Sequence, residues 1–434
     1  MSLRSSAPAP DILAAPRFDS HRLRIAVCDY SGHPFQVQLS RELALRGHEV
    51  NHVYFREFQT PHGCLMLRPS DPPSLSIEGV SLGRPFPKDS LVRRRSEEIA
   101  VGQRIAASLA DFDPDAVIAC NLPLDALHQV VQRAKREGWR LFFWQQDIYS
   151  VAIEKILSKK FGPAGVLAGR HYRRLEKIAL DSSQKVIVIS PDFVRTLTRE
   201  FGVESSKIDV IENWAPLDEI VPRPKSNPWS RKHGLDNREV VLYSGTLGMK
   251  HDPALLLALA HAISQREGAI LVVTSEGAGA DWLAREGRGL ASLRVLPFQP
   301  YDDYPDVLGS ADVLVAILEN DAGAFSVPSK ILSYLCSGRP IVLSAPPENL
   351  AGRTVRRAGA GEVVPSGEPT QFAQTVISLL NNKERRQRCG VSARQFAHQR
   401  FDIQKIADRF TGILADGASV MPMAASRNAG RTIQ

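Results

Sequence analysis

The sequence predicts an α/β protein built from two doubly wound Rossmann-like domains that face a central cleft. Short runs rich in β-branched residues alternate with longer amphipathic runs in both halves of the chain, which is typical of parallel sheets covered by helices. The 434 residues are too many for one ordinary hydrophobic core. A stretch rich in Pro, Ser and Arg interrupts the alternation at residues 217–238 and indicates a linker.

In the first half, each predicted strand is a short apolar run and each predicted helix a longer amphipathic one. The strands are predicted at residues 23–28, 50–55, 115–120, 141–144, 185–189 and 208–211. Helices are predicted at 36–46, where Gly47 ends the helix, and at 96–109, 124–137 and 192–201.

The same alternation restarts after the linker. Strands are predicted at residues 239–243, 270–274, 294–297, 313–318 and 341–343, and helices at 253–265, 280–285, 372–380 and much of 383–414, with a short helix beginning near Lys330. We therefore expect a disordered tail (1–20), a first domain (21–216), a linker (217–238), a second domain (239–400), a C-terminal helix (401–414) and a second disordered tail (415–434).

Composition and charge restrict the possible partners. The five cysteines are scattered without metal-binding spacing, and the first 20 residues lack the apolar segment of a signal peptide, so we expect a soluble cytoplasmic protein. The net charge is +7, and basic residues cluster between Glu154 and Lys177 among apolar ones. This cluster predicts one or two amphipathic helices that suit an anionic membrane surface; the alternative is a solvated helix face. No recognition motif for nucleic acid is present.

Two loops of the second half have the character of phosphate-binding segments. Ser326-Val327-Pro328-Ser329-Lys330 leads from a loop into a short helix, whose N–H groups and positive dipole end suit a phosphate. Ser244-Gly245-Thr246-Leu247-Gly248-Met249-Lys250 follows a strand, and its glycines allow close approach of a ligand to the backbone. The alternatives are a capped helix with a solvent-exposed lysine and a tight turn. The second loop is neither a Walker A loop nor a dinucleotide fingerprint, because its spacing differs from both.

Two further loops at the same sheet edge complete the pattern. Glu276-Gly277 follows one predicted strand, and Phe298-Gln299-Pro300 follows the next and adds an aromatic ring. Phosphate loops beside a flat aromatic residue indicate a nucleoside-diphosphate site.

These motifs resemble those of the retaining GT-B glycosyltransferases of family 4. The second half is similar to their nucleotide-sugar domain at 245–251, 275–277, 296–300, 311–313, 326–330 and 338–340. The first half is similar at 32–34, 43–50, 188–190 and 211–214, so the resemblance extends from Leu23 to Leu414. It is greatest to bacterial enzymes of O-antigen, capsule and colanic-acid assembly.

The resemblance implies roles for individual residues. Lys250 would bind the pyrophosphate, the turn at Phe298 and Gln299 would face the base, and Gly32-His33 would be a flexible loop facing the acceptor and the donor phosphates. The expected catalytic residues are Lys250, Asp147 and His33. The expected donor-binding residues are Gly32, Gly245, Thr246, Gly248, Glu276, Phe298, Gln299, Asp321, Ser326, Val327, Pro328, Ser329, Lys330 and Ser333.

The chain departs from the family pattern at several positions. Two glutamates that many members place eight residues apart are Phe325 and Ser333 here. A serine hydroxyl can hydrogen-bond a ribose, and Glu319 or Asp321 is expected to bind the donor sugar instead of Phe325. Thr246 replaces an arginine, and Gln146 replaces a histidine beside Asp147.

The resulting functional hypothesis is transfer of a sugar from a nucleoside-diphosphate sugar to a lipid-linked glycan in cell-surface polysaccharide biosynthesis, with retention of configuration. No metal or other cofactor is expected, because lysine and helix dipoles can neutralise the diphosphate. Asp111-Phe112-Asp113 is interpreted as a turn rather than a metal site. The expected location is the cytoplasm, at the inner face of the plasma membrane. A nucleotide-sugar 2-epimerase and a non-catalytic nucleotide-sugar-binding subunit are the alternatives.

Overall fold

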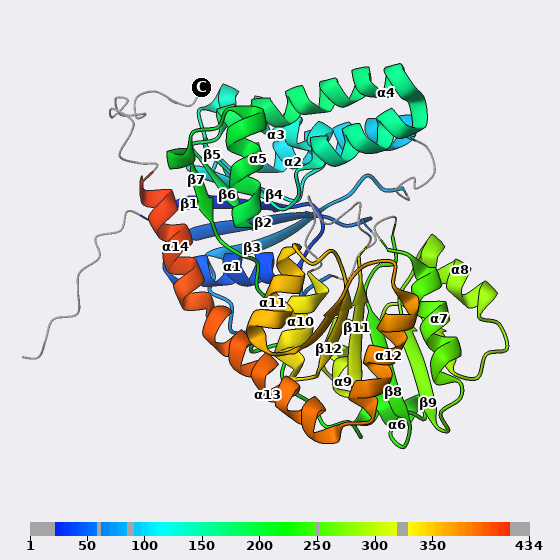
Figure 1. Ribbon diagram of the computed structural model, residues 1–434. Coiled ribbons are helices and arrows are strands. Elements are labelled where there is room, and N and C mark those ends of the chain that lie inside the picture. Colours follow the sequence, from blue (N-terminus) through cyan, green and yellow to red (C-terminus); the bar gives the residue numbers. More distant parts are fainter. Residues whose placement is uncertain (1–21, 59–61, 85–90, 249–250, 319–328, 417–434) are drawn as a thin grey trace, which may run out of the picture.

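The computed structural model describes residues 22–58, 62–84, 91–248, 251–318 and 329–416. Two parallel β-sheets form the centres of two α/β domains, which lie one above the other in Figure 1. The strand pairs within the described residues are all parallel. The predicted fold class, two doubly wound Rossmann-like domains, is confirmed.

The sheet of the first domain has the strand order 3-2-1-4-5-6-7. Its members are β1 (Arg24–Asp29), β2 (Glu49–Phe55), β3 (Leu75–Val80), β4 (Ala116–Cys120), β5 (Arg140–Gln145), β6 (Lys185–Val188) and β7 (Ile208–Val210). Every residue of β4 is buried, because helices cover both faces of the sheet. The order reverses between β1 and β4, which opens a crevice beyond the carboxyl ends of these strands.

The helices that the structure describes between the strands of this sheet are α1 (Pro34–Leu45), α2 (Leu91–Phe112), α3 (Leu124–Glu137), α4 (Tyr149–Ser182) and α5 (Pro191–Phe201). The element α4 contains the basic region and is broken at Gly162, whose φ of 57° and ψ of −131° are not helical. Glycine tolerates this conformation and Pro163 begins the next segment, so α4 forms a helical hairpin that projects from the first domain (Figure 1). None of the helices in the described residues is long and apolar enough to cross a membrane.

The sheet of the second domain has the order 10-9-8-11-12-13. Its strands are β8 (Glu239–Ser244), β9 (Ala269–Thr274), β10 (Leu293–Leu296), β11 (Val313–Ile317), β12 (Ile341–Ser344) and β13 (Gly361–Val364). The helices are α7 (Pro253–Ile263), α8 (Ala278–Glu286), α9 (Tyr304–Gly309), α10 (Lys330–Ser337), α11 (Leu350–Ala358) and α12 (Pro369–Leu380). The order reverses between β8 and β11, so a second crevice opens beside the end of β8.

Some elements were not predicted from the sequence. The strands β3 and β13 lie at sheet edges and contain exposed or half-buried residues, so neither presents a continuous apolar run. The helix α11 and the one-turn η1 (Ser205–Lys207) were also missing from the prediction. The one-turn η2 (Tyr301–Asp303) leads into α9, where Asp302 and Asp303 before Tyr304 predict a helix start. The predicted linker contains a short helix, α6 (Pro228–Lys232), which packs against α9.

The C-terminal helices join the two domains. The helix α13 (Lys383–Arg400) packs against α10, α11 and α12 of the second domain, and α14 (Ile403–Asp416) packs against α1 of the first (Figure 1). Arg46, directly after α1, forms an ion pair with Asp408 at 2.7 Å. The centroid of the Phe410 ring lies 4.8 Å from that of Trp144. The chain therefore crosses between the domains twice, through the linker and between α13 and α14.

Candidate active site

A cavity of about 560 Å³ lies between the two domains, at the carboxyl ends of their strands. Its size falls in the range of small-ligand sites. The first domain contributes His33, Pro34, Phe35, His62, Gly63 and Asp147. The segment that leads into the linker contributes Trp214, Ala215 and Pro216, and the second domain contributes Ser244, Gly245, Thr246, His251, Phe298, Gln299, Tyr301, Tyr304, Leu318, Ser329, Lys330 and Ser333.

Many of the residues predicted from the sequence meet in this cavity. Those that line it are His33, Asp147, Gly245, Thr246, Phe298, Gln299, Ser329, Lys330 and Ser333. Three more lie beside lining residues. Gly32 precedes His33 in the chain, the N–H of Gly248 donates to Nδ1 of His251, and the Glu276 carboxylate accepts from the N–H of Phe298. The remaining predicted residues lie outside the described part of the chain: Lys250, Asp321, Ser326, Val327 and Pro328.

The loop that carries His33 is shaped by a buried aspartate. Asp29 ends β1, and its carboxylate accepts hydrogen bonds from the backbone N–H groups of Ser31 at 3.1 Å and His33 at 2.6 Å. Burial raises the pKa of Asp29 to about 7, although these hydrogen bonds oppose the shift. Gly32 adopts a φ of 68°, so the turn needs glycine at this position. The loop presents His33 at the start of α1.

Asp147 lies on a second fixed segment of the first domain. It follows β5 and precedes α4, whose first N–H groups at Tyr149 and Ser150 both donate to the buried Glu176 carboxylate at 3.1 Å. Burial raises the pKa of Glu176 to about 7, although its hydrogen bonds to Ser150 oppose the shift. Glu176 thus caps the start of α4 from the far arm of the helical hairpin, and it holds the turn at Asp147 in place.

Aromatic side chains form the wall where the first domain meets the linker. The ring of Phe35 packs edge-on against Trp144 at 5.7 Å and against Trp214 at 5.4 Å. The two indoles stack with centroids 5.6 Å apart. His33 in turn stacks on Phe35 at 5.8 Å. These contacts give the imidazole of His33 a rigid support.

In the second domain, the loop after β8 is adapted to close contact with its neighbours. Gly245 has a φ of 129°, and a Cβ at this position would lie 2.8 Å from Cε of Lys330. The hydroxyl of Tyr243 donates to the carbonyl of Thr246 at 2.8 Å, and the N–H of Leu247 donates to the Ser275 hydroxyl at 3.1 Å. The loop is therefore fixed from both sides, with its backbone facing the cavity.

Lys330 is the lysine that the structure places in this cavity. Its ammonium lies 4.1 Å from the ring centroid of Tyr243 and donates a hydrogen bond to the Tyr243 hydroxyl. Burial lowers the pKa of Lys330 to about 7, because the surrounding residues replace water around the charge. An anionic ligand in the cavity would favour its charged form.

The first turn of α10 bears on the alternative interpretation of this segment as a capped helix. Ser329 precedes the helix, but its side chain makes no capping hydrogen bond, and its φ of −62° and ψ of −26° are already helical. The structure therefore does not support a serine cap at Ser329. One turn later, Ser333 lines the cavity beside Tyr304. Burial raises the pKa of Tyr304 to about 12, although hydrogen bonds with Ser333 and Ser244 oppose the shift.

The turn after β10 is held by residues on both sides. The N–H of Phe298 donates to the Glu276 carboxylate at 3.2 Å. The indole N–H of Trp229 on α6 donates to Oε1 of Gln299 at 2.8 Å. Phe298 and Gln299 consequently present a fixed edge to the cavity, while Glu276 supports that edge from outside.

Sequence reasoning did not single out several of the cavity residues. Neither His62 nor the tyrosines Tyr301 and Tyr304 belonged to a motif, although both tyrosines follow the turn at Gln299 closely. Three histidines and one lysine line the cavity in the described residues, against a single carboxylate, Asp147. The lysine and the imidazole N–H groups can donate hydrogen bonds to an anionic ligand.

No group of three or more His, Cys, Asp and Glu side chains that could hold a metal ion occurs in the part of the chain that the structure describes. The sequence Asp111-Phe112-Asp113 lies at the end of α2, where Oδ1 of Asp113 accepts a hydrogen bond from the indole of Trp139 at 3.0 Å. Asp113 adopts a φ of 47°, which is typical of a turn.

Both halves of the chain match family models. Residues 33–214 match a model described as a glycosyl transferase 4-like domain, and residues 225–396 match a model described as glycosyl transferases group 1. The chain belongs to the GT-B glycosyltransferases. The cavity of this glycosyltransferase lies between the two matched domains.

Curated relatives of this glycosyltransferase are distant and match it in part. Escherichia coli WcaI, named for glycosyl transfer in colanic acid biosynthesis, is 25% identical over 239 residues, which is 54% of this chain and 58% of WcaI. Spore coat protein SA of Bacillus subtilis is 23% identical over 265 residues, which is 55% of this chain and 66% of that protein. The match thus spans less than two thirds of each relative.

Solved structures share the fold of this glycosyltransferase over most of its length. Sucrose-phosphate synthase from Thermosynechococcus elongatus has a TM-score of 0.70 at 15% identity and covers 92% of this chain and 100% of its own. Anabaena HepE, solved in complex with UDP-glucose, has a TM-score of 0.64 at 14% identity and covers 91% and 100%. At such identities the likeness shows the fold alone.

Proposed function

We propose that this glycosyltransferase transfers a sugar from a nucleoside-diphosphate sugar to a lipid-linked glycan acceptor, with retention of configuration, in cell-surface polysaccharide biosynthesis. The observation that carries the proposal is the position of Lys330. Its ammonium lies in the interdomain cavity, beside the backbone of Gly245 and at the start of α10. A cation, a glycine-bordered loop and a helix start together suit a diphosphate.

The donor side of the proposal uses the second domain. The fixed edge at Phe298 and Gln299 is the proposed contact for the base, and Ser333 is the proposed ligand of the ribose. The Anabaena HepE structure contains UDP-glucose, which supports a uridine diphosphate sugar as the first donor to test. Lys250 and Asp321, predicted from the sequence to bind the pyrophosphate and the sugar, remain part of the proposal.

The chemistry requires stabilisation of the departing diphosphate. Negative charge develops on its oxygens as the glycosidic bond breaks, and Lys330 with the N–H groups at the start of α10 would stabilise that charge in a site closed to water. For retention, the acceptor hydroxyl would attack from the side of the leaving group, and a phosphate oxygen would take its proton. Asp147 is the alternative base. No metal or other cofactor is part of this proposal.

The acceptor side of the proposal uses the first domain and the helical hairpin α4. Three of its apolar side chains are largely exposed, Ile156 and Phe161 at 47% and Leu167 at 69%. Basic residues surround them: Lys155, Lys159, Lys160 and Arg170. Apolar residues beside positive charges suit an anionic membrane surface, at which a lipid-linked acceptor would be presented. The relative WcaI, named for colanic acid biosynthesis, supports a polysaccharide acceptor.

The two alternatives, a 2-epimerase and a non-catalytic binding subunit, differ from a transferase in what they require of the site. A 2-epimerase needs several carboxylates and histidines around the sugar; the described cavity residues supply three histidines but a single carboxylate, Asp147. A non-catalytic subunit would bind a nucleotide sugar without turnover.

The test is a donor screen with purified protein, extracted lipid-linked glycans and a panel of nucleoside-diphosphate sugars. Release of nucleoside diphosphate that depends on the acceptor would support transfer. Conversion of the donor sugar without an acceptor would indicate an epimerase. Binding of a nucleotide sugar with no turnover on any acceptor would indicate a binding subunit, and the transferase proposal would then fail.

A further inference from the structure

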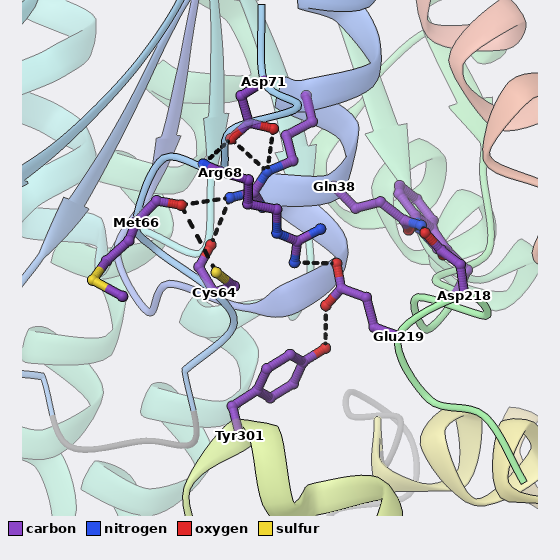
Figure 2. A network of polar contacts seen from close by, with 10 residues as sticks. Gln38, Cys64, Met66, Arg68, Asp71, Asp218, Glu219 and Tyr301 are labelled. Carbon is purple, nitrogen blue, oxygen red and sulfur yellow. Dashed lines mark hydrogen bonds and ion pairs between the residues drawn. The ribbon is translucent and has the colours of Figure 1, made fainter.

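The carboxylate of Glu219 joins both domains beside the cavity (Figure 2). Nη2 of Arg68 donates to Oε1 of Glu219 at 2.7 Å, and the hydroxyl of Tyr301 donates to Oε2 at 2.7 Å. Arg68 lies between β2 and β3 of the first domain, Glu219 lies in the linker, and Tyr301 begins η2 of the second domain. We call these three residues the Arg68–Glu219–Tyr301 bridge.

At one end of the bridge, Tyr301 lies on the side of the cavity that the second domain forms, which we call the donor wall. Tyr301 lines the cavity two residues after Gln299, and its ring stacks on Tyr304 with centroids 6.4 Å apart. Burial and the adjacent Glu219 carboxylate raise the pKa of Tyr301, so its hydroxyl remains a hydrogen-bond donor. A displacement of the turn at Gln299 would therefore also displace the Tyr301 hydroxyl and its hydrogen bond to Glu219.

The Arg68 end is fixed to the first domain by a second arginine. Arg41 on α1 pairs with Asp71 at 3.0 Å, and its Nη2 donates to the carbonyls of Cys64 at 3.0 Å and Met66 at 2.8 Å (Figure 2). Asp71 also accepts a hydrogen bond from the N–H of Arg68 at 2.9 Å. The side chains of Arg41 and Asp71 are 7% and 6% exposed, so the segment from 64 to 71 is anchored from within.

This anchored segment adjoins the side of the cavity that the first domain forms, which we call the His33 wall. Its neighbour Gly63 donates an N–H to the carbonyl of Gly32 at 2.9 Å. A Cβ on Gly32 would lie 2.7 Å from Cδ1 of Leu65, so the segment and the His33 loop are in close contact. His62, Gly63 and His33 all line the cavity. The bridge thus connects the turn at Gln299 with the loop that carries His33.

We propose that Glu219 is a positioning residue for sugar transfer, and that the Arg68–Glu219–Tyr301 bridge sets the spacing between the donor wall and the His33 wall of the cavity. This inference rests on the proposed function. Oε1 of Glu219 accepts a hydrogen bond from the first domain, and Oε2 accepts one from the second. A glutamine at this position would remove the negative charge from both contacts, and its Nε2 would have to donate to the Tyr301 hydroxyl instead of accepting from it. The effect should then appear in turnover more than in nucleotide binding, since transfer needs both walls at the right distance.

Steady-state kinetics and nucleotide titration calorimetry of Glu219→Gln, Tyr301→Phe and the double variant test this role. We expect kcat to fall about tenfold in Glu219→Gln, as for loss of a charge-assisted hydrogen bond, and the Kd of the nucleoside diphosphate to stay within about twofold. Tyr301→Phe should add little to Glu219→Gln, because each variant interrupts the same Arg68–Glu219–Tyr301 bridge. Asp218→Asn is the matched control, since asparagine still accepts the hydrogen bond from Gln38.

Two kinetic outcomes would overturn the inference: unchanged kcat in Glu219→Gln, or independent, multiplying losses in the double variant. A loss confined to the nucleotide Kd would also overturn it, because Tyr301 would then be a simple donor contact. Amide hydrogen exchange supplies a readout that needs no turnover. Tyr301→Phe, a change in the second domain, should speed exchange in residues 62–71 of the first. Unchanged exchange there would contradict the bridge. Absence of wild-type turnover would refute only the proposed function.

Discussion

The ammonium of Lys330 lies 4.1 Å from the centroid of the Tyr243 ring and donates to the hydroxyl of the same side chain. The ring stabilises the cation without neutralising it, whereas a carboxylate partner would cancel its charge. Tyr243 is itself held by its hydrogen bond to the Thr246 carbonyl at 2.8 Å. The cation is thereby fixed at the entrance to α10, where the proposed function needs it.

Replacement of Lys330 by methionine should weaken nucleoside-diphosphate binding about 10- to 100-fold at pH 7, because one charge-assisted contact is lost while the side-chain volume is retained. Isothermal titration calorimetry with UDP measures this change. Lys232→Met on the exposed surface of α6 is the control and should bind as wild type does. Equal affinities of Lys330→Met and wild type would remove Lys330 from the donor site.

The pH dependence of binding should also follow Lys330. Burial lowers its pKa to about 7 in the free protein, and a bound diphosphate would raise it again. Lys330 is therefore charged below pH 7 and loses its proton as the pH rises, so the Kd should increase by up to about tenfold per unit between pH 7.5 and 9. Histidines ordinarily titrate below this window. The profile of Lys330→Met should be flat, and a wild-type profile that is equally flat would refute the assignment.

Substitution of Gly245 by alanine should reduce both stability and binding. The new Cβ would lie 2.8 Å from Cε of Lys330, and the φ of 129° strains any residue with a side chain. We expect a loss of about 1–3 kcal/mol in the free energy of unfolding, together with weaker UDP binding.

Gly268→Ala separates these two effects. Gly268 also has a positive φ, 76°, but nothing lies within 4 Å of the position that a Cβ would take there. This variant should lose stability without losing affinity for UDP. Chemical denaturation and calorimetry of both variants provide the comparison, and similar affinity losses in the two would show that strain alone weakens binding.

Substitution of Asp147 by asparagine distinguishes the two routes for the acceptor proton. If a phosphate oxygen takes the proton, as proposed, kcat should fall by less than about tenfold, because the substitution would change only the electrostatic surroundings of the acceptor hydroxyl. A fall of about 100-fold or more, with loss of the acidic limb in the pH–rate profile, would make Asp147 the base. Nucleotide affinity provides the check that the cavity is intact.

The exposed apolar residues of α4 should determine membrane association. Phe161→Glu/Leu167→Glu should reduce flotation with vesicles of anionic lipid, because it places two charges at the proposed contact. Val391→Glu on α13, where the valine is 58% exposed, is the matched control and should float as wild type does. Binding should also weaken at high salt. Equal flotation of all three proteins would exclude α4 as the contact.

The sequence predicted the sheet strands best where they are buried. The buried strands β1, β4, β8 and β11 present continuous apolar runs, whereas β3 and β13 lie at edges and do not. Residues of the motifs after β8 and β10 line the cavity, since the carboxyl ends of parallel strands in one sheet lie at the same edge. His33 follows β1 of the first sheet and Lys330 follows β11 of the second, and they meet in one cavity because it lies between the two domains, at the carboxyl ends of both sheets.

Contacts between distant segments could not be predicted in the same way. Tyr301 and Glu219 are 82 residues apart, and Arg68 and Glu219 are 151 apart. No periodicity connects them, because their meeting depends on how the two domains and the linker pack. The support of Lys330 by Tyr243 likewise follows from the neighbouring positions of β8 and α10, which only the folded chain reveals.

The return of α14 to the first domain has a consequence for any attempt to study the domains separately. Phe410 is fully buried, with its ring against those of Trp144 and Trp214. A fragment ending near residue 216 would expose both indoles to water and lose the support beneath Phe35 and His33. The first domain is thus completed by α14, so the wall that carries His33 should reach its final form only after residues 403–416 have left the ribosome.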